Sequence, residues 1–293
     1  MSTHVKSRSN MEKVLHRFFS RKIAVLGTVL VILIILFAVF GSSAARYTYD
    51  DANTADRYQE PGSDHWFGTD DLGRDIFARV VDGAGITLEV AFGSSLVALV
   101  FGTVLGLISG YFGGLFDEVL SGFMNSLWAL PTIVLAMAIN VALDASLFNI
   151  LLSVGIVNIP GFYRIVRSRV ISIKNMDYIM ATKAVGQDTL VIIFSHVLPN
   201  LLSTLIVEAT LCCSKAVIAE ASLSFLGLGV QLPHASWGTM LKAGYPLLNR
   251  APWICIIPGL FIVVLVLGLN LMGDGLNLND VSALQAVTYD NFY

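Results

Sequence analysis

Long stretches without a charged residue place the tightest limit on what this chain can fold into. Two examples run from Ile23 to Gly41 and from Val90 to Phe116. A bilayer core about 30 Å thick is crossed by roughly 20 apolar residues in helical form. Backbone groups in lipid must find their hydrogen-bond partners within the segment, so such runs are expected to be helices. Only 13% of the residues are charged, against roughly 25% in a soluble domain. The sequence therefore predicts a membrane protein.

The apolar runs predict an all-α membrane protein with six transmembrane helices. We expect these helices at 23–41, about 88–109, about 119–143, about 145–163, about 201–219 and about 251–273. The polar parts are an N-terminal tail at 1–22, a loop at 42–85, a segment at 164–200 within the core 86–276, and a C-terminal tail at 277–293. The first run has 19 residues. It exceeds the apolar part of a typical signal peptide, so we interpret it as an uncleaved anchor.

The distribution of Lys and Arg predicts which side of the membrane each polar part faces. The N-terminal tail has six basic residues and one acidic residue, and the segment between the fourth and fifth helices is also basic. The stretch 42–82 has four basic and nine acidic residues. With six spans, both termini are expected in the cytoplasm and the acidic loop outside. The C-terminal tail has no Lys or Arg and adds nothing to this argument.

The polar segment before the fifth span predicts a helix–turn–helix projection on the cytoplasmic side. Gly186 interrupts its first helix, because glycine allows a positive φ or the close approach of another backbone. A second apolar stretch ends at Leu198-Pro199, where the proline marks a helix boundary or first turn. The small residues of the projection suit insertion into a groove of a partner protein. The residues of the first helix at helical spacing are Met180, Ala181, Ala184 and Val185.

The loop after the first span contains a dense group of glycines and aspartates, which is typical of turns. The Arg74 guanidinium could hold these turns together by pairing with a nearby carboxylate. Candidate partners are Asp70, Asp71 and Asp75.

Two charged residues, Glu208 and Lys215, lie within the fifth predicted span. Seven residues correspond to two helical turns, roughly 10.5 Å along the axis on one face, so we do not expect a direct pair. Charged groups inside spans usually face a cavity or a partner. One interpretation is that each residue snorkels or pairs with a neighbouring helix. The other is a polar stripe along a water-filled path, which would offer complementary charges to a zwitterionic peptide.

Several other chemistries find no support in the sequence. The net charge of −3 gives no reason to expect nucleic acid as a partner. The three cysteines lie in apolar runs, unlike a spaced disulfide or metal framework, and we interpret them as core residues. The sequence contains no GxxxxGK[ST] phosphate-binding loop and no Ser/His/Asp or metal constellation. We therefore expect no cofactor, ATP site or enzymatic centre in this chain.

Several motifs resemble the permease subunits of peptide and nickel ABC importers. The stretch 65–75, HWFGTDDLGRD, is similar to their HxxGTDxxGRD signature. Ala181, Gly186 and Leu198-Pro199 have the spacing of their coupling motif. This chain departs from the motif at Met180, where glutamate is usual, and at Thr182, where a second alanine is usual. Similar stretches occur in family order up to 270–276, and they look like the second permease of the pair. The signature residues that we single out are Gly68, Thr69, Asp70, Gly73, Arg74 and Asp75.

The resemblance implies a type I permease fold with a cytoplasmic coupling helix, in a bacterial cytoplasmic membrane. In such importers two different permeases form the pathway, and an extracytoplasmic binding protein delivers the substrate. Two separate ATP-binding subunits hold ATP and Mg²⁺, and the coupling motif docks on them. Di- and oligopeptides are the expected substrates, with nickel or metallophore complexes as the alternative.

Two other classes of protein remain open from the residues alone. An intramembrane enzyme would need paired catalytic groups within the spans, and Glu208 with Lys215 is weak support for one. A secondary transporter would usually show inverted repeats and broken helices in matching halves, and we see no internal repeat. ATP dependence of uptake in reconstituted vesicles separates these classes from an ABC importer.

Overall fold

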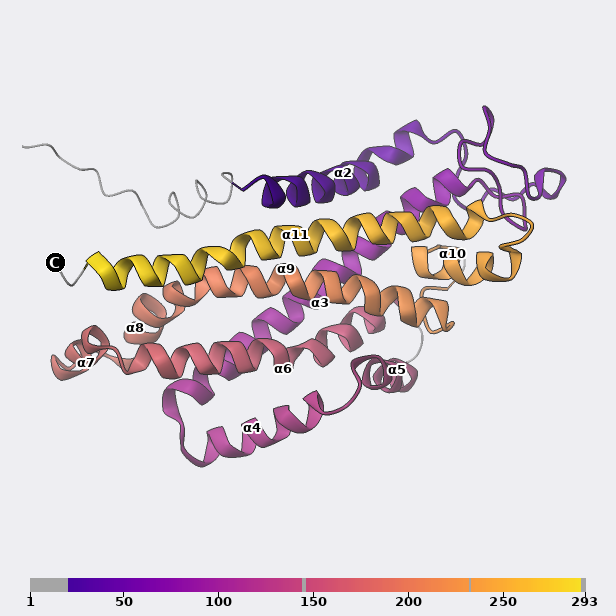
Figure 1. Ribbon diagram of the computed structural model, residues 1–293. Helices are drawn as coiled ribbons and strands as arrows, with labels where there is room; N and C mark the ends of the chain where they lie inside the picture. Colours follow the sequence, from indigo (N-terminus) through magenta and orange to yellow (C-terminus); the bar gives the residue numbers. More distant parts are fainter. Residues whose placement is uncertain (1–20, 144–145, 232, 291–293) are drawn as a thin grey trace, which may run out of the picture.

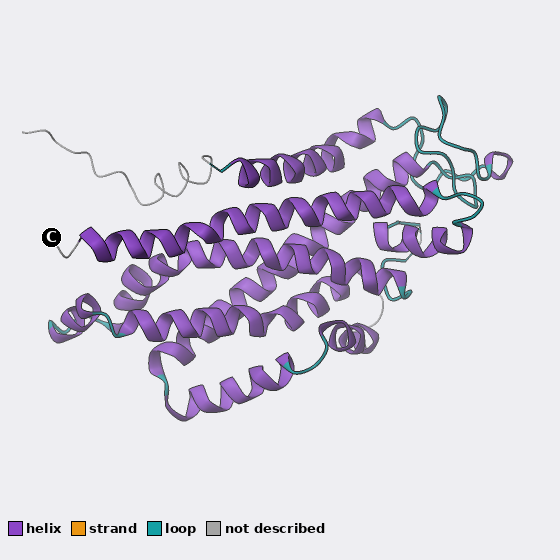
Figure 2. Cartoon of the chain, in the orientation of Figure 1, coloured by secondary structure: helices purple, strands orange, loops and turns teal. Residues whose placement is uncertain are grey.

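The computed structural model describes residues 21–143, 146–231 and 233–290, and only the backbone for 276–290 (Figure 1). Most of the predicted N-terminal tail, 1–20, lies outside the described residues. The described chain is helical and contains no strand (Figure 2), which confirms the predicted all-α class. The helices are α2 (Lys22–Ala44), α3 (Ile76–Phe112), α4 (Gly114–Trp128), α5 (Thr132–Leu143), α6 (Leu147–Lys174), α7 (Asp177–Ala184), α8 (Thr189–Ile192), α9 (Leu198–Phe225), α10 (Trp237–Gly244) and α11 (Trp253–Asp290). Short 3₁₀ turns, η1 (Thr54–Asp56) and η3 (Tyr245–Leu247), and a π-helical turn, η2 (Ile193–Val197), complete the chain.

Five stretches of the described chain are long and apolar enough to cross a membrane, and a sixth candidate is bent. The five are Lys22–Ala44, Ile76–Phe112, Leu147–Lys174, Thr189–Phe225 and Trp253–Gly275. The stretch predicted as a single third span at 119–143 consists of α4 and α5, which meet at 96°. Pro131 lies at the break between them. Proline has no backbone N–H and restricts the preceding residue, so a straight helix does not continue there.

Several helices are longer than the apolar runs that predicted them. Helix α3 begins at Ile76, where the Asp75 side chain caps it by accepting a hydrogen bond from the Ala78 N–H at 2.9 Å. Helix α6 continues to Lys174, so the segment 164–200 contains its last turns as well as α7 and α8. Helix α11 extends to Asp290, through most of the expected C-terminal tail. Hydropathy marks where a chain meets lipid, whereas a helix ends where its backbone bonds or caps end.

A stripe of glycines lets α3 approach α6 closely. Gly106 and Gly110 lie one helical turn apart, and Gly102 precedes them by another turn. A Cβ at Gly106 would stand 2.8 Å from Val166 Cβ, and one at Gly110 would stand 2.9 Å from the Arg167 carbonyl oxygen. Small residues at this spacing are typical of tightly packed membrane helices. The stripe therefore brings α6 close to α3, and α6 contributes Tyr163, Arg164, Arg167, Ser168 and Arg169 to the cavity described below.

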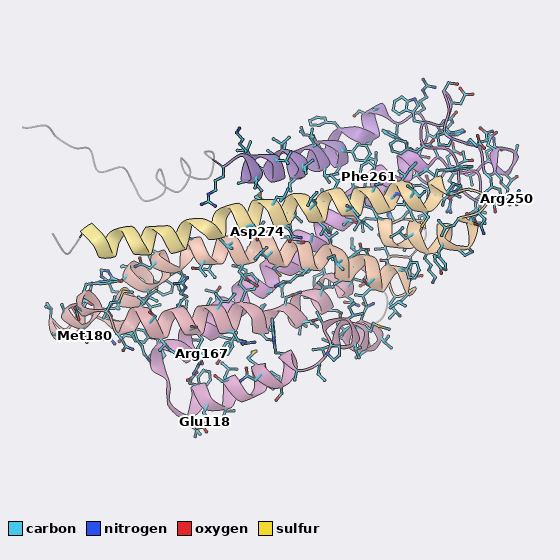
Figure 3. All side chains as sticks on the ribbon, viewed as in Figure 1. Glu118, Arg167, Met180, Arg250, Phe261 and Asp274 are labelled. Carbon is cyan, nitrogen blue, oxygen red and sulfur yellow. The ribbon has the colours of Figure 1, made fainter. Side chains whose placement is uncertain are left out.

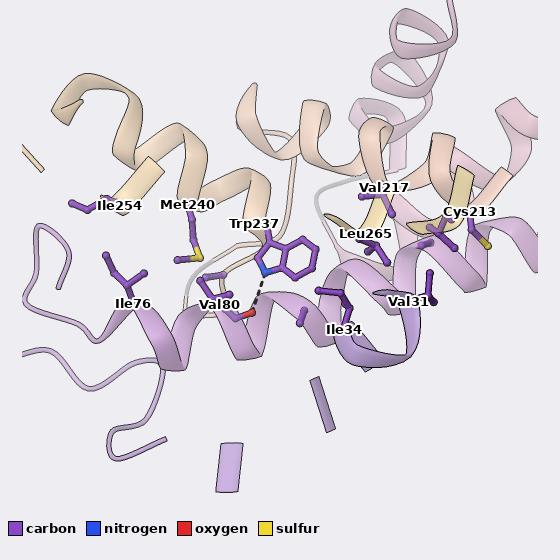
Figure 4. Packing of buried hydrophobic residues seen from close by; sticks show 14 of the residues in the cluster. Val31, Ile34, Ile76, Val80, Cys213, Val217, Trp237, Met240, Ile254 and Leu265 are labelled. Atoms are coloured by element: carbon purple, nitrogen blue, oxygen red, sulfur yellow. Dashed lines mark hydrogen bonds between the residues drawn. The ribbon is translucent and has the colours of Figure 1, made fainter. Parts of the chain in front are cut away.

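A large apolar core joins α2, α3, α9, α10 and α11 (Figure 4). Trp237 is fully buried at its centre, and its indole Nε1 donates to the Val80 carbonyl at 2.9 Å. Cys213 belongs to the same core, and Cys212 is buried beside it in α9. Helix α10 has only eight residues. The buried Trp237 side chain anchors it against the long helices.

Two polar regions lie at opposite ends of the helices (Figure 1). The loop between α2 and α3 lies at one end, together with α10. Helices α7 and α8 lie at the other end, near the C-terminal end of α11. The loop between α2 and α3 and the predicted projection are thus separated by the length of the long helices (Figure 1).

Candidate functional site

The signature loop is organised around the carboxylate of Asp70, which is 4% exposed. It accepts hydrogen bonds from the backbone N–H groups of Leu72 and Arg74 at 2.9 and 3.0 Å. It also pairs with Arg74 Nε at 2.7 Å, and Arg79 Nε lies at 3.5 Å. Two guanidinium groups and two amides offset the cost of burying this charge. The predicted pairing of Arg74 with a nearby carboxylate is confirmed for Asp70, and Asp71 lies farther away at 3.8 Å.

The third predicted partner, Asp75, does not pair with Arg74 and has a different position. Its carboxylate lies 2.9 Å from His65 Nδ1 and also caps α3. His65 is itself buried and stacks on Tyr47 with ring centroids 4.6 Å apart. Sequence reasoning placed His65 in the signature but gave it no role. The signal in the sequence was that the first and last residues of HWFGTDDLGRD are the His65 and Asp75 that pair here.

The remaining signature residues shape the turns. Gly68 and Gly73 have φ values of +77° and +76°, a region that favours glycine. A Cβ on Gly73 would collide with the Asn53 carbonyl oxygen. The Thr69 hydroxyl accepts from the Gln59 N–H at 2.8 Å and donates to the Asp56 carbonyl, which ties the two halves of the loop together. The signature residues thus form a compact, hydrogen-bonded loop at one end of the protein.

The projection at the opposite end is α7 with the turn at Gly186. Ile179 is fully buried and packs with Ile192 and Val197, so α7 is anchored on α8 and η2. Gly186 has a φ of +84° and donates its N–H to the Lys183 carbonyl at 3.0 Å. Lys183 in turn lies over the Tyr111 ring, 4.8 Å from its centroid, which links α7 to the end of α3. A backbone hydrogen bond therefore stabilises the turn at Gly186, and the contact of Lys183 with Tyr111 holds the helix that precedes it.

The outer face of α7 is open and largely apolar. Met180 is 51% exposed and Val185 is 88% exposed. A shallow cavity of about 560 Å³ adjoins this face, and its lining residues are Ala181, Thr182, Val185, Gly186 and Gln187. Ala184 is exposed as well. Leu198 and Pro199 lie apart from this face, in the first turn of α9, which η2 connects to α8.

A cavity of about 720 Å³ opens between α4, α6 and α9. Glu208 and Lys215 both line it. The expectation that these two cannot pair directly is wrong, because Lys215 Nζ lies 3.5 Å from Glu208 Oε1. Side chains of a helix lean toward its N-terminus, and a long lysine can thus span most of two turns. The remaining lining residues are Ser121, Asn125, Trp128, Gly161, Tyr163, Arg164, Ile165, Arg167, Ser168, Arg169 and Thr204.

One wall of this cavity contains an ion pair that sequence reasoning missed. Arg167 of α6, labelled in Figure 3, binds Asp117 of α4. The two hydrogen bonds run from Nε to Oδ1 at 2.6 Å and from Nη2 to Oδ2 at 2.7 Å. Asp117 also accepts hydrogen bonds from the hydroxyls of Ser109 and Ser121. The Tyr163 hydroxyl lies 2.7 Å from both serine hydroxyls. This network joins α3, α4 and α6. Its two α6 members lie 42 to 54 residues from the groups that they contact, so no local pattern could reveal it.

A second missed residue is Glu220, which is fully buried in α9. Its Oε1 accepts from the Ser224 hydroxyl at 2.6 Å. Its Oε2, like Thr87 Oγ1 on α3, has no hydrogen-bond partner among the described residues. In sequence it is the first residue of the stretch EASLSFLGLGV, and only packing shows that its side chain is enclosed.

Comparison with known proteins gives two family matches. Residues 102–279 match the model described as "binding-protein-dependent transport system inner membrane component". Residues 9–61 match "N-terminal TM domain of oligopeptide transport permease C".

Individual relatives cover nearly the whole chain. The dipeptide transport system permease protein DppC of Alkalihalophilus pseudofirmus is 46% identical over 255 residues, which cover 87% of this chain and 84% of that protein. The oligopeptide transport system permease protein OppC of Bacillus subtilis is 40% identical over 271 residues, which cover 92% and 89%. The glutathione transport system permease protein GsiD of Pectobacterium atrosepticum is 37% identical over 261 residues, which cover 89% and 87%.

Proposed function

Since the chain belongs to the family of binding-protein-dependent transport system inner membrane components, we propose that it forms half of the pathway by which an ABC importer carries di- and oligopeptides into a bacterial cell. The named relatives are permeases for dipeptides, oligopeptides and glutathione. Their names favour a peptide over a nickel or metallophore complex. The complete importer adds a second homologous permease, two ATP-binding subunits that hold ATP and Mg²⁺, and an extracytoplasmic binding protein.

The observation that carries this proposal is the exposed face of α7. Its apolar side chains Met180 and Val185 face outward, whereas Ile179 anchors the helix in the protein. A short, anchored helix with an open apolar face suits insertion into a groove of a partner. In our proposal that partner is an ATP-binding subunit, and α7 is the coupling helix.

The proposed orientation has both termini and α7 in the cytoplasm and the signature loop outside. The excess of basic residues in the N-terminal tail and in 164–200, and of acidic residues in 42–82, supports it. The signature loop and α7 also lie at opposite ends of the helices (Figure 1).

The proposed mechanism transmits motion from α7 to the cavity between α4, α6 and α9. When ATP closes the ATP-binding subunits, they displace α7. Because α7 follows α6 directly and leads through α8 and η2 into α9, both cavity-lining helices receive that displacement. The cavity then alternates between outward and inward access. Glu208 and Lys215 offer a passing peptide complementary charges for its ammonium and carboxylate groups.

Reconstitution tests this function directly. The chain, its partner permease and the ATP-binding subunits would be placed in liposomes, with binding protein loaded with a radiolabelled peptide outside and ATP inside. We expect peptide uptake that stops when ATP is replaced by a non-hydrolysable analogue. Uptake driven by an ion gradient without ATP would identify a secondary transporter. Hydrolysis of the peptide without uptake would identify an enzyme.

A further inference from the structure

The cavity between α4, α6 and α9 has more positive than negative groups. Four cations line it, namely Arg164, Arg167, Arg169 and Lys215, whereas Glu208 is the one acidic lining residue. Two of the cations have carboxylate partners, because Arg167 binds Asp117 and Lys215 lies beside Glu208. Within the described part of the chain, Arg164 and Arg169 have no acidic partner. The cavity therefore presents positive charge that the protein itself does not neutralise.

Arg164 is the better positioned of these two cations. Its guanidinium carbon lies 5.2 Å from the centroid of the Trp128 ring. A guanidinium stacked by its face keeps its edge N–H donors free for a planar acceptor such as a carboxylate. The Trp128 ring, which is 50% exposed, lies near Gly161, where a Cβ would stand 3.3 Å from Trp128 Cζ3 and 3.7 Å from Glu208 Oε1. Trp128 and Glu208 thus both lie close to Gly161, which precedes Arg164 in α6 by about one helical turn.

The surroundings fit a small zwitterion. The volume of about 720 Å³ lies within the range of small-molecule sites. The hydroxyl and amide side chains of Ser121 and Asn125 also line the cavity. Glu208 adds a negative charge to the lining of the same cavity, which disfavours an anionic lipid headgroup and favours a ligand that also has an ammonium group.

We propose that Arg164, stacked on Trp128, binds the C-terminal carboxylate of the peptide during transport. This inference rests on the proposed peptide import and adds a chemical preference to it, in which the carboxylate binds Arg164 and not Lys215, whose ammonium already lies beside Glu208. The permease itself selects peptides with a free carboxyl terminus over those whose terminus is amidated, because a neutral amide forms no charge-assisted pair with the guanidinium.

The test compares trialanine with trialanine amide in the reconstituted importer. Uptake of each peptide would be measured with saturating loaded binding protein, for the wild type and for Arg164→Gln. The preference of the binding protein is the same for both permeases, so it cancels when the trialanine to trialanine amide uptake ratio of the variant is divided by that of the wild type. We expect Arg164→Gln to lower trialanine uptake roughly tenfold, as for a lost hydrogen bond to a charged group, and to change trialanine amide uptake less than twofold.

Matched variants make the result specific. Arg250 lies over Tyr58 at 4.3 Å outside the cavity, so Arg250→Gln removes a similar pair and should leave the ratio of the two peptides unchanged. Trp128→Leu keeps the charge and removes the stack, and it should shift the ratio in the same direction as Arg164→Gln but less. Stimulation of ATPase activity by loaded binding protein shows whether a variant importer has assembled. If Arg164→Gln does not assemble, the uptake ratio of Trp128→Leu tests the inference in its place.

Three results would overturn the inference. They are an equal loss of both peptides in Arg164→Gln, no loss of either, or a loss of trialanine uptake that occurs in phosphatidylglycerol vesicles and is absent in phosphatidylcholine vesicles. The last result would assign the arginine to a lipid phosphate. A wild-type importer that takes up neither peptide would instead refute the proposed function.

Discussion

Single carboxylates organise two distant parts of this protein. Asp70 gathers two backbone amides and two arginines in the signature loop. Asp117 gathers Arg167 and two serine hydroxyls beside the cavity. In both places the negative charge is compensated by several donors, so loss of one donor leaves a partly paired buried charge.

The glycines of the signature loop give a prediction about stability. Gly73→Ala forces a residue with a Cβ into a φ of +76° and against the Asn53 carbonyl. We expect a loss of about 2 kcal/mol or more in the free energy of unfolding, measured by thermal unfolding in detergent. Gly85→Ala is the control, because Gly85 lies in α3 with nothing within 4 Å, and alanine favours a helix. Equal melting temperatures for the two variants would show that the loop tolerates the change.

The pair Glu208 and Lys215 gives a prediction about transport. The Lys215 side chain is 56% exposed and the separation is 3.5 Å, so the pair contributes less than about 1 kcal/mol to stability. Glu208→Gln and Lys215→Met should therefore leave the melting temperature nearly unchanged and lower peptide uptake several-fold. Both variants would be assayed for uptake and thermal unfolding together. Normal uptake and unchanged specificity in both would remove these residues from the path.

At the scale of elements, α7 combines a fixed and an open side. Burial of Ile179 and the contact of Lys183 with Tyr111 hold it in place. Its outer side is exposed among the described residues, and a Cβ at Gly186 would meet none of them within 4 Å. A change on that outer side should thus affect docking while leaving the fold of the chain intact.

Gly186→Arg tests this property of α7. We expect membrane insertion to persist and ATP-driven uptake to fall at least tenfold, because a bulky charge would enter the proposed docking face and arginine disfavours a φ of +84°. Gly113→Arg separates the loss of docking from the backbone strain, since Gly113 also has a positive φ of +70° and open space but lies outside α7. Uptake assays and membrane fractionation give both readouts. Normal transport by Gly186→Arg would argue against coupling through this helix.

At the scale of the whole molecule, one apolar core joins the first span to the last. Trp237 packs where α10 meets α3 and α11, and Phe261 of α11 lies 5.6 Å from its ring centroid. Figure 4 shows residues of this core from several helices gathered around the indole. Packing of this kind replaces the hydrophobic effect as the attraction between helices in lipid.

Truncation of Trp237 should therefore destabilise the entire protein. We expect Trp237→Ala to cost about 3–5 kcal/mol and Trp237→Phe about 1–2 kcal/mol, since the latter removes mainly the hydrogen bond to Val80. Thermal unfolding in detergent measures both. Trp66→Ala is the comparison, because Trp66 is 45% exposed in the loop between α2 and α3, and its effect should be smaller. Equal effects at the two tryptophans would contradict a central role for Trp237.

The sequence by itself determined the all-α membrane class and that Arg74 pairs with one of three neighbouring carboxylates, of which the structure selects Asp70. These follow from hydropathy and from neighbours within a few residues, which are local properties of the chain. The tertiary structure decided the rest. It bent the third span at Pro131, continued α6 and α11 beyond their apolar runs, and brought Lys215 to Glu208. It also joined Asp117 to Arg167 across 50 residues. Which charges meet depends on side-chain direction and on how helices pack, and neither is encoded in any short stretch of sequence.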